Sequence, residues 1–458
     1  MSPFAAAPWY LGDGQAVLVG DTDWEFAALW AAVAERARRL VERGLAPGQL
    51  VLVPTSPPLD LVLMQFALAR CDAALLPVSA GLSLGRRAAL VALTGAEWIW
   101  VPGGVPGRLE PQSEMQTAAL WRDDPLALVI ETSGSSGAPK AVMLSQGAVL
   151  ASAIQVNARL ALRPGDLWLC CLPRHHIGGL AIAYRCALAG ATLVLHPGFD
   201  ATAVAADLVR RRVTHLSLVP PMLARLLDHL HDGPPPALRV ALVGGQGLSP
   251  ALAQRALGAG WPLYATYGMT ETGSQVASSG PLTEAPFEGV VGLPLPGLTL
   301  DCPACGEPAR ALRLRGELVM AGYANPGRIP GMGLDGGWLT TADLACRTPN
   351  GDLRILGRSD EALVIAGEQV FPALVGQRLM GAPGVGAVVL LGLPDDAWGH
   401  RLVAVYVGEA EPAALARWCD GHLTRAERPR SVLRLDALPV LASGKYDMRE
   451  IRRLVGAG

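Results

Sequence analysis

Short apolar runs alternate along this chain with Ala-, Leu- and Arg-rich segments of helical length, and this alternation constrains the fold strongly. The runs are QLVLVPTS, LWLCCLP, ATLVLHP, THLSLVP and RVALVGG. Segments with apolar residues at helical spacing lie between them, as at 24–43 and 201–212. Strands that alternate with such helices form βαβ units, in which helices cover both faces of a parallel sheet. The pattern therefore predicts an α/β fold of mostly parallel sheets with flanking helices.

The pattern changes near the C-terminus. After GDLRILGRSDEALVIAG the chain continues with short strands and two or three helices. A chain of 458 residues, of which 51% are hydrophobic, is long enough for two or more hydrophobic cores. We predict a large N-terminal domain at 1–357, a hinge at 358–361 and a small, mobile C-terminal α+β domain at 362–458.

Charge and hydropathy argue against several classes of protein. The formal net charge is −2, and the Arg and Lys residues are dispersed, so no basic patch for nucleic acid or anionic lipid is expected. The first residues, MSPFAAAPWYLGDG, lack a basic segment followed by a long apolar one, and we expect a cytoplasmic protein. The apolar stretch 178–195 contains Arg185 and Gly190, which favours a buried helix, turn and strand over a membrane span.

The eight cysteines include one CxxC pair, Cys302 and Cys305. No second pair follows at the spacing of a zinc site, so a structural turn is favoured over a metal centre. The remaining cysteines are expected to be reduced thiols in the core.

The stretch ETSGSSGAPKAVMLS follows the apolar run 126–130 and is the strongest candidate for a ligand-binding loop. Glycine-rich turns let backbone N–H groups converge on an anion, while hydroxyls and one ammonium add further donors. It is not a Walker loop, because Pro139 precedes Lys140 and Ala141 stands where that motif has Ser or Thr. The pattern predicts a polyphosphate site.

Six motifs give the chain a resemblance to a known family. They are TSGSSGAPKAVMLS, ALVGGQGLSP, YGMTETG, GWLTTADLA, LGRSDEALVIAGEQVFP and LASGKYDMREI. They occur in the order found in adenylate-forming acyl- and aryl-CoA synthetases, which are similar to luciferases and to the adenylation domains of peptide synthetases. The resemblance implies that ATP and a carboxylic acid form an acyl-adenylate and pyrophosphate, after which many relatives transfer the acyl group to a thiol.

The resemblance assigns nucleotide and CoA contacts to residues of these motifs. It implies that Asp343 receives the ribose hydroxyls, that Tyr267 lies against adenine and that Arg358 contacts ribose or phosphate. Gly367 lies in a loop that relatives use for thioester formation. The other cofactor-binding residues that it implies are Thr132, Ser133, Gly134, Ser135, Ser136, Gly137, Lys140, Gly245 and Gln246.

The resemblance also assigns catalytic roles. It implies that Lys445 inserts beside the carboxylate and the α-phosphate, that Thr270 lies near the same groups, and that Glu271 binds Mg²⁺. A compact ammonium there would stabilise the charge that develops as two anions approach. His176 would gate the acyl site, and Asp360 would be the hinge about which the C-terminal domain rotates.

The substrate pocket is expected near LPRHHIGGLAIAYR. The resemblance places His176, Gly178 and Gly179 there, with Gly268 from YGMTETG. Arg174 stands where relatives have an apolar residue, and a cation beside the acyl pocket would suit an acid with a second carboxylate. Arg185 is an alternative partner for that carboxylate, and either arginine could instead be a surface residue.

Within the family, HIGGL, THLSLVPPMLARLL and DDAWGHRLVAVYV make the chain most similar to the compact o-succinylbenzoate:CoA ligases. The implied cofactors and partners are ATP, Mg²⁺, coenzyme A and a small carboxylic acid, and the sequence is compatible with a homodimer. Two alternatives stay open: another aryl- or acyl-CoA ligase, and a stand-alone adenylation enzyme that loads a carrier-protein thiol.

Overall fold

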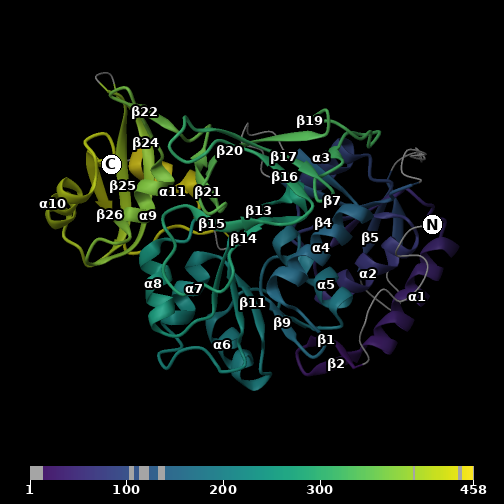
Figure 1. The fold of residues 1–458 in the computed structure, drawn as a ribbon. Helices are drawn as coiled ribbons and strands as arrows, with labels where there is room; N and C mark the ends of the chain where they lie inside the picture. The colour runs from purple at the N-terminus through teal and green to yellow at the C-terminus, as the bar shows by residue number, and fades with distance from the viewer. Residues whose placement is uncertain are drawn as a thin grey trace.

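The structure is a computed structural model that describes residues 14–102, 108–112, 123–132, 140–395, 398–441 and 446–456. Its elements form stacked layers at the N-terminal side and a smaller sheet with helices at the C-terminal side (Figure 1). No helix in the described part of the chain is long and apolar enough to span a bilayer. The α/β class and the small C-terminal domain predicted above are confirmed.

The predicted apolar runs build a parallel sheet in the order β13-β12-β11-β9-β10-β1, with β2 antiparallel at its edge. Its strands are β1 (Gln15–Val19), β2 (Thr22–Glu25), β9 (Leu167–Cys170), β10 (Thr192–Leu195), β11 (His215–Leu218), β12 (Val240–Val243) and β13 (Leu263–Met269). All four residues of each of β10, β11 and β12 are buried, as expected for strands covered on both faces.

Helices cover both faces of this sheet (Figure 1). One face packs against α6 (Ala201–Arg210), α7 (Pro220–Leu227) and α8 (Pro250–Gly258). The other packs against α4 (Gln146–Leu160) and α5 (Ile177–Ala189). The stretch 178–195 is thus the expected buried helix, turn and strand, with Gly190 at a φ of 65° between α5 and β10.

A second sheet lies on the far side of α4 in the order β18-β8-β7-β4-β3-β5-β6. Its strands are β3 (Leu50–Pro54), β4 (Ala74–Val78), β5 (Trp98–Val101), β6 (Arg108–Pro111), β7 (Leu126–Thr132), β8 (Lys140–Ser145) and β18 (Gly322–Tyr323). The helices associated with it are α1 (Phe26–Glu42), α2 (Pro58–Arg70) and α3 (Leu84–Thr94). Strands β7 and β8 therefore carry the ends of the predicted phosphate loop.

The apolar runs did not reveal that the sheet continues with antiparallel strands beyond β13. These strands are β14 (Ser274–Ser278), β15 (Val290–Pro294), β16 (Leu298–Asp301), β17 (Arg310–Gly316), β19 (Leu334–Asp335), β20 (Trp338–Arg347) and β21 (Leu353–Arg358). Many of their residues are only partly buried, so they lack the continuous apolar runs of the parallel strands.

The C-terminal part has its own sheet, and two of its hydrophobic clusters consist of residues from 363 onward. Its elements are β22 (Leu363–Ile365), β23 (Glu368–Val370), α9 (Pro372–Leu379), β24 (Val385–Asp395), β25 (Gly399–Gly408), α10 (Pro412–His422), β26 (Ser431–Arg434) and α11 (Met448–Gly456). Arg378 of α9 reaches the N-terminal part, where its Nε lies 2.7 Å from a carboxylate oxygen of Glu288. The predicted boundary at 358–361 and the mobility of this domain remain predictions.

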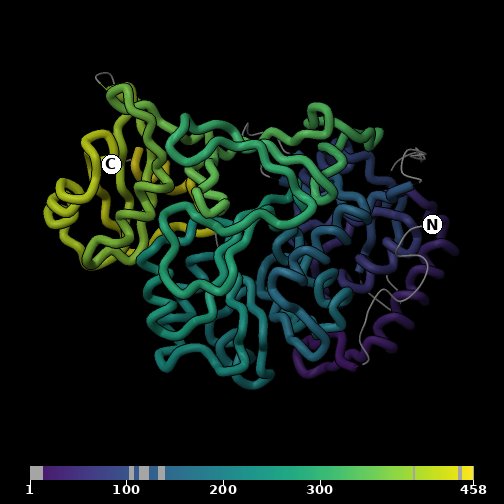
Figure 2. Tube along the Cα trace, viewed as in Figure 1, coloured from purple at the N-terminus to yellow at the C-terminus, as the bar shows by residue number. Residues whose placement is uncertain are grey.

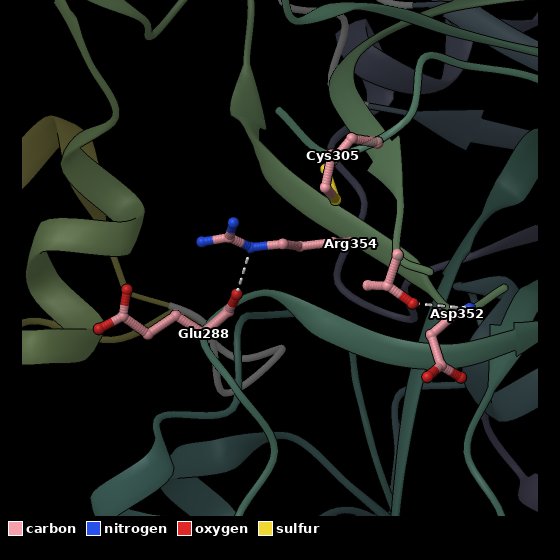
Figure 3. Close-up of a disulfide and its surroundings, with 6 residues drawn as sticks. Glu288, Cys305, Asp352 and Arg354 are labelled. Carbon is pink, nitrogen blue, oxygen red and sulfur yellow. Dashed lines mark hydrogen bonds between the residues drawn. A yellow bond between two sulfur atoms is a disulfide. The ribbon is translucent and has the colours of Figure 1, made fainter. Parts of the chain in front are cut away.

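The cysteine prediction is wrong for one pair, because Cys305 is bonded to Cys346 (Figure 3). Backbone hydrogen bonds from Arg347 to Pro303 and from Cys305 to Arg347 bring the two cysteines together, although 41 positions separate them in sequence. Cys302 is a free thiol. The pair was missed because it depends on a long-range strand contact that no cysteine spacing encodes.

A buried ion pair fixes residues 322–333 to the N-terminal sheet. Arg328 Nη2 lies 2.5 Å from Glu97 Oε1, and the two side chains are 2% and 1% exposed. Arg328 also donates to the carbonyl oxygen of Gly95, at the end of α3, while Glu97 accepts from the Leu50 N–H. Figure 2 shows this green segment lying against the blue N-terminal layer.

We expect Arg328→Met to destabilise the protein by about 3–5 kcal/mol, because it leaves the Glu97 carboxylate buried without its cation. Chemical unfolding measures this loss, and the double variant Glu97→Leu/Arg328→Met should recover most of it. The exposed pair Arg255 and Asp228 is the control, since Arg255→Met should cost at most about 1 kcal/mol. Equal losses at Arg328 and Arg255 would contradict the anchoring role.

Candidate active site

Three strands of the parallel sheet, β9, β12 and β13, end at the same edge, and predicted site residues lie at or just after their ends. Arg174 and His176 follow β9, Gly245 and Gln246 follow β12, and Tyr267 lies in the last part of β13. Ligands of open α/β sheets bind outside the carboxyl ends of the strands. The fold thus brings together residues that lie up to about ninety positions apart in the sequence.

Glycine is required at two points of this edge. A Cβ atom on Gly268 would lie 1.8 Å from the Ser274 carbonyl oxygen, where β14 turns back beside β13. A Cβ atom on Gly244 would lie 2.8 Å from the Thr266 carbonyl oxygen. Gly268 was predicted to contact substrate, and the structure gives it a backbone-packing role as well.

The turn between β13 and β14 presents Thr270 and Glu271 in a short 3₁₀ helix, η2 (Thr270–Thr272). Tyr323 Oη of β18 donates to Glu271 Oε1 at 3.0 Å, and Lys140 Nζ lies 4.8 Å from the centre of the Tyr323 ring. Burial and the neighbouring Glu271 carboxylate raise the pKa of Tyr323, so its hydroxyl remains a donor at neutral pH. The structure therefore joins the predicted metal ligand to the predicted phosphate-binding lysine through a tyrosine that sequence reasoning missed.

A second cluster joins Tyr267, Asp343, Arg358 and Asp360. Tyr267 Oη donates to Asp343 Oδ2 at 2.5 Å, and Arg358 Nη1 lies 3.8 Å from Asp343 Oδ1. Asp343 and Arg358 are direct cross-strand partners in β20 and β21. Arg358 also binds both carboxylate oxygens of Asp360, at 2.9 and 3.0 Å. These contacts hold the predicted ribose-binding carboxylate between a tyrosine and an arginine.

The two clusters influence each other electrostatically. Burial raises the pKa of Tyr267 strongly, and the Asp343 and Glu271 carboxylates raise it further, whereas Arg358 opposes them. Arg358 also opposes the upward shift in the pKa of Tyr323. Charged groups of each cluster therefore shift the pKa of a tyrosine in the other cluster, so the two clusters lie close enough to interact.

The predicted phosphate loop joins the ends of two paired strands. Thr132 of β7 is the register partner of Lys140 of β8. Ser133, Gly134, Ser135, Ser136 and Gly137 lie outside the described residues, so their predicted roles remain predictions. Lys445 also lies outside them, in the stretch between Val440 and Tyr446, which form an isolated β-bridge.

The predicted substrate residues around α5 differ in their surroundings. His176 is exposed, and its ring centre lies 4.3 Å from that of His175. Gly179 packs so closely on the chain before it that a Cβ atom would lie 2.6 Å from the Pro173 carbonyl oxygen, whereas Gly178 has only Leu172 Cδ1 nearby, at 3.7 Å. Arg174 is buried and donates to the His196 carbonyl oxygen at 2.6 Å.

Arg185 is a buried cation in α5 that has no carboxylate partner among the described residues. Its side chain is 2% exposed, and neither Nε nor Nη2 forms a hydrogen bond there. Its guanidinium lies 5.4 Å from the centre of the Trp168 ring. Burial lowers the pKa of Arg185 to about 10, so the group remains charged at neutral pH. Such a charge costs free energy unless an anion joins it.

Two further placements concern the C-terminal part. Gly367 lies in the turn between β22 and β23 with a φ of 85°, and nothing lies within 4 Å of the position of its missing Cβ. The side chain of Gln377 in α9 packs against Gly247, in the loop after β12. A Cβ atom on Gly247 would lie 2.2 Å from Gln377 Nε2, so a larger residue does not fit there unless Gln377 moves. Sequence reasoning missed Gln377, and no motif spacing identifies it.

The residues present fit a single Mg²⁺ ion. Glu271 Oε1 accepts from Tyr323, and no described group bonds to Oε2, which leaves a hard oxygen ligand available. Mg²⁺ commonly uses one or two protein carboxylates together with substrate phosphates. The described residues contain no group of three His, Cys, Asp or Glu side chains that could hold a metal by themselves.

Comparison with known proteins agrees with this geometry. The family model for AMP-binding enzymes matches residues 103–325, and the model for the AMP-binding enzyme C-terminal domain matches residues 375–445. A 2-succinylbenzoate–CoA ligase of Bacillus mycoides is 34% identical over 335 residues, which are 71% of this chain and 70% of that protein.

Solved structures give the same result over nearly the whole chain. Bacillus subtilis o-succinylbenzoate CoA synthetase (MenE) with the acyl-adenylate OSB-AMP is 25% identical, with a TM-score of 0.80 over 96% of this chain and 95% of that one. The same protein with ATP and a magnesium ion is 26% identical, with a TM-score of 0.81 over 96% and 97%. ATP-bound MatB from Rhodopseudomonas palustris, at 22% identity, shares the fold with a TM-score of 0.83 over 97% and 96%. The chain belongs to the AMP-binding enzyme family and is an AMP-forming acid–thiol ligase of the acyl-CoA synthetase type.

Proposed function

We propose that this enzyme forms a CoA thioester of an aromatic acid with a second carboxylate, such as o-succinylbenzoate. One carboxylate oxygen attacks the α-phosphorus of ATP and pyrophosphate leaves, which gives an acyl-adenylate. The thiol of CoA then attacks the acyl carbon, loses its proton and displaces AMP. Mg²⁺ would neutralise phosphate charge in the first step.

The residues at the sheet edge have separate tasks in this proposal. Asp343 is positioned by Tyr267 and Arg358 and accepts hydrogen bonds from the ribose hydroxyls. Lys140 and the loop before it hold the phosphates, and Glu271 would hold the metal ion. Lys445 stabilises the negative charge that develops between the carboxylate and the α-phosphate.

Arg185 is the observation that carries the substrate assignment. A second carboxylate buried without a partner would cost several kcal/mol, so the acyl pocket must supply a cation or several donors. Arg185 offers a buried guanidinium whose Nε and Nη2 have no hydrogen-bond partner among the described residues and which stacks on Trp168, whereas Arg174 donates through Nη1 to a backbone carbonyl and has only Nε unbonded there. Gly178 and Arg185 are seven residues apart in α5 and therefore share one helix face, about 10 Å apart along the axis, and only Leu172 lies near the missing Cβ of Gly178. This arrangement favours Arg185 over Arg174 as the carboxylate partner.

A panel of acids separates this proposal from the alternatives. Pyrophosphate release is measured with o-succinylbenzoate, benzoate and aliphatic monoacids and diacids, each with and without CoA. The proposal expects the highest kcat/KM with o-succinylbenzoate and a thioester product with CoA. Preference for a monoacid would favour another acyl- or aryl-CoA ligase, and an adenylate that CoA does not consume would favour a carrier-protein thiol as acceptor.

We expect Arg185→Met to raise KM for o-succinylbenzoate at least about tenfold, or 1.4 kcal/mol, and to leave KM for benzoate nearly unchanged. Its thermal stability should be equal or higher, because an apolar side chain replaces a buried charge that has no carboxylate partner among the described residues. Arg174→Met is the matched control and should not discriminate between the two acids. If only Arg174→Met raises KM for o-succinylbenzoate and not for benzoate, Arg174 is the carboxylate partner. If neither variant has this selective effect, the diacid assignment is wrong.

Lys445→Ala should slow acyl-adenylate formation about 100- to 1000-fold, as expected for the loss of one transition-state donor. Pre-formed acyl-adenylate should still react with CoA at the wild-type rate. Single-turnover assays of each half-reaction measure both rates. Equal damage to the two half-reactions would refute a role confined to adenylation.

Asp360→Pro should spare adenylation and slow thioester formation, because proline fixes its own φ and restricts Ser359 before it. The variant also removes the carboxylate that binds Arg358, so Asp360→Ala is the control that removes this contact without fixing the backbone. Single-turnover rates should show the thioester defect in the proline variant only. The same defect in Asp360→Ala would assign it to the lost ion pair rather than to hinge motion.

A further inference from the structure

Tyr323 lies between two groups that the nucleotide requires. Its hydroxyl donates to Glu271 Oε1 at 3.0 Å, and its ring lies beneath the Lys140 ammonium at 4.8 Å. The two partners come from different sheets, since Lys140 begins β8 and Glu271 follows β13. Tyr323 is therefore a side chain that contacts both a phosphate-binding residue and the carboxylate suited to Mg²⁺.

Several contacts fix the position of Tyr323. Its backbone pairs with Val142 in the ladder between β18 and β8, and its N–H donates to the Met332 carbonyl oxygen. Gly333 packs against the ring so closely that a Cβ atom there would lie 2.5 Å from it. The chain then continues to Arg328, whose ion pair with Glu97 is fully buried. The tyrosine thus belongs to a segment attached to the N-terminal sheet.

These contacts define what Tyr323 does to Glu271. A donor on Oε1 restrains the rotation of the carboxylate, while Oε2, to which no described group bonds, can bind a cation. The Met320 N–H donates to the Glu271 carbonyl oxygen at 2.7 Å, which holds the backbone of the same residue. Partners of this kind orient a metal-binding carboxylate, and their loss typically lowers metal affinity 10- to 100-fold.

We propose that Tyr323 is a positioning residue that presents the Glu271 carboxylate to the metal–nucleotide complex and supports Lys140 with its ring. This inference rests on the proposed binding of ATP and Mg²⁺ but not on the identity of the acid. Its test therefore measures metal and nucleotide binding without any acid, so that failure of the substrate assignment leaves the test intact.

The test measures Mn²⁺ binding by electron paramagnetic resonance in the full-length protein, saturated with a non-hydrolysable ATP analogue. Tyr323→Phe should raise the Kd for Mn²⁺ about tenfold and leave metal-free binding of the analogue unchanged, because the ring beneath Lys140 is kept. Tyr323→Leu, which also removes the ring, should weaken analogue binding even without metal.

Two controls separate positioning from a general structural effect. Tyr264→Phe removes a hydroxyl from the start of β13, away from Glu271, and should bind Mn²⁺ as the wild type does. In a Glu271→Ala background, Tyr323→Phe should cause no further loss of Mn²⁺ affinity, because its effect passes through that carboxylate. Wild-type Mn²⁺ affinity in Tyr323→Phe, or a full additional loss in the Glu271→Ala background, would overturn the proposal.

Discussion

The close approach of β14 to Gly268 is the contact on which the site depends. The chain reverses there from the parallel sheet into the antiparallel strands, and the Ser274 carbonyl oxygen occupies the space that any side chain at position 268 would need. This reversal places Thr270 and Glu271 at the edge of the sheet and leads, through β14 and β15, to the strands that carry Asp343 and Arg358. A single tight turn therefore connects the carboxylate proposed to bind the metal with the one proposed to bind ribose.

Much of the fold follows from local sequence, because buried parallel strands are continuous apolar runs. The runs 167–170, 192–195, 215–218 and 240–243 are strands of one sheet, and the stretch 178–195 is helix, turn and strand as predicted. The antiparallel strands and the disulfide between Cys305 and Cys346 were not predicted, since both depend on pairing between distant segments. Local patterns do not contain that information.

The candidate site likewise contains residues that local sequence predicts and residues that only the three-dimensional structure reveals. Family motifs identified Tyr267, Glu271 and Asp343, but their partners could be found only in three dimensions. Tyr323 is 52 positions from Glu271 in sequence, and Gln377 reaches Gly247 from another domain. The two arginines considered for a second carboxylate looked equivalent in sequence. Both are buried, and hydrogen bonding distinguishes them, because Arg174 donates to a carbonyl oxygen while Arg185 Nε and Nη2 have no partner among the described residues.

The central claim is that the acid is activated through an acyl-adenylate, and isotope transfer tests it most directly. The enzyme would be supplied with o-succinylbenzoate carrying ¹⁸O in both carboxylates, together with ATP, Mg²⁺ and CoA, and the products examined by mass spectrometry. The oxygen that attacks the α-phosphorus leaves with AMP when CoA displaces it. The account predicts one ¹⁸O atom in AMP, none in pyrophosphate, and a CoA thioester of the acid. Unlabelled AMP formed together with the thioester would contradict it.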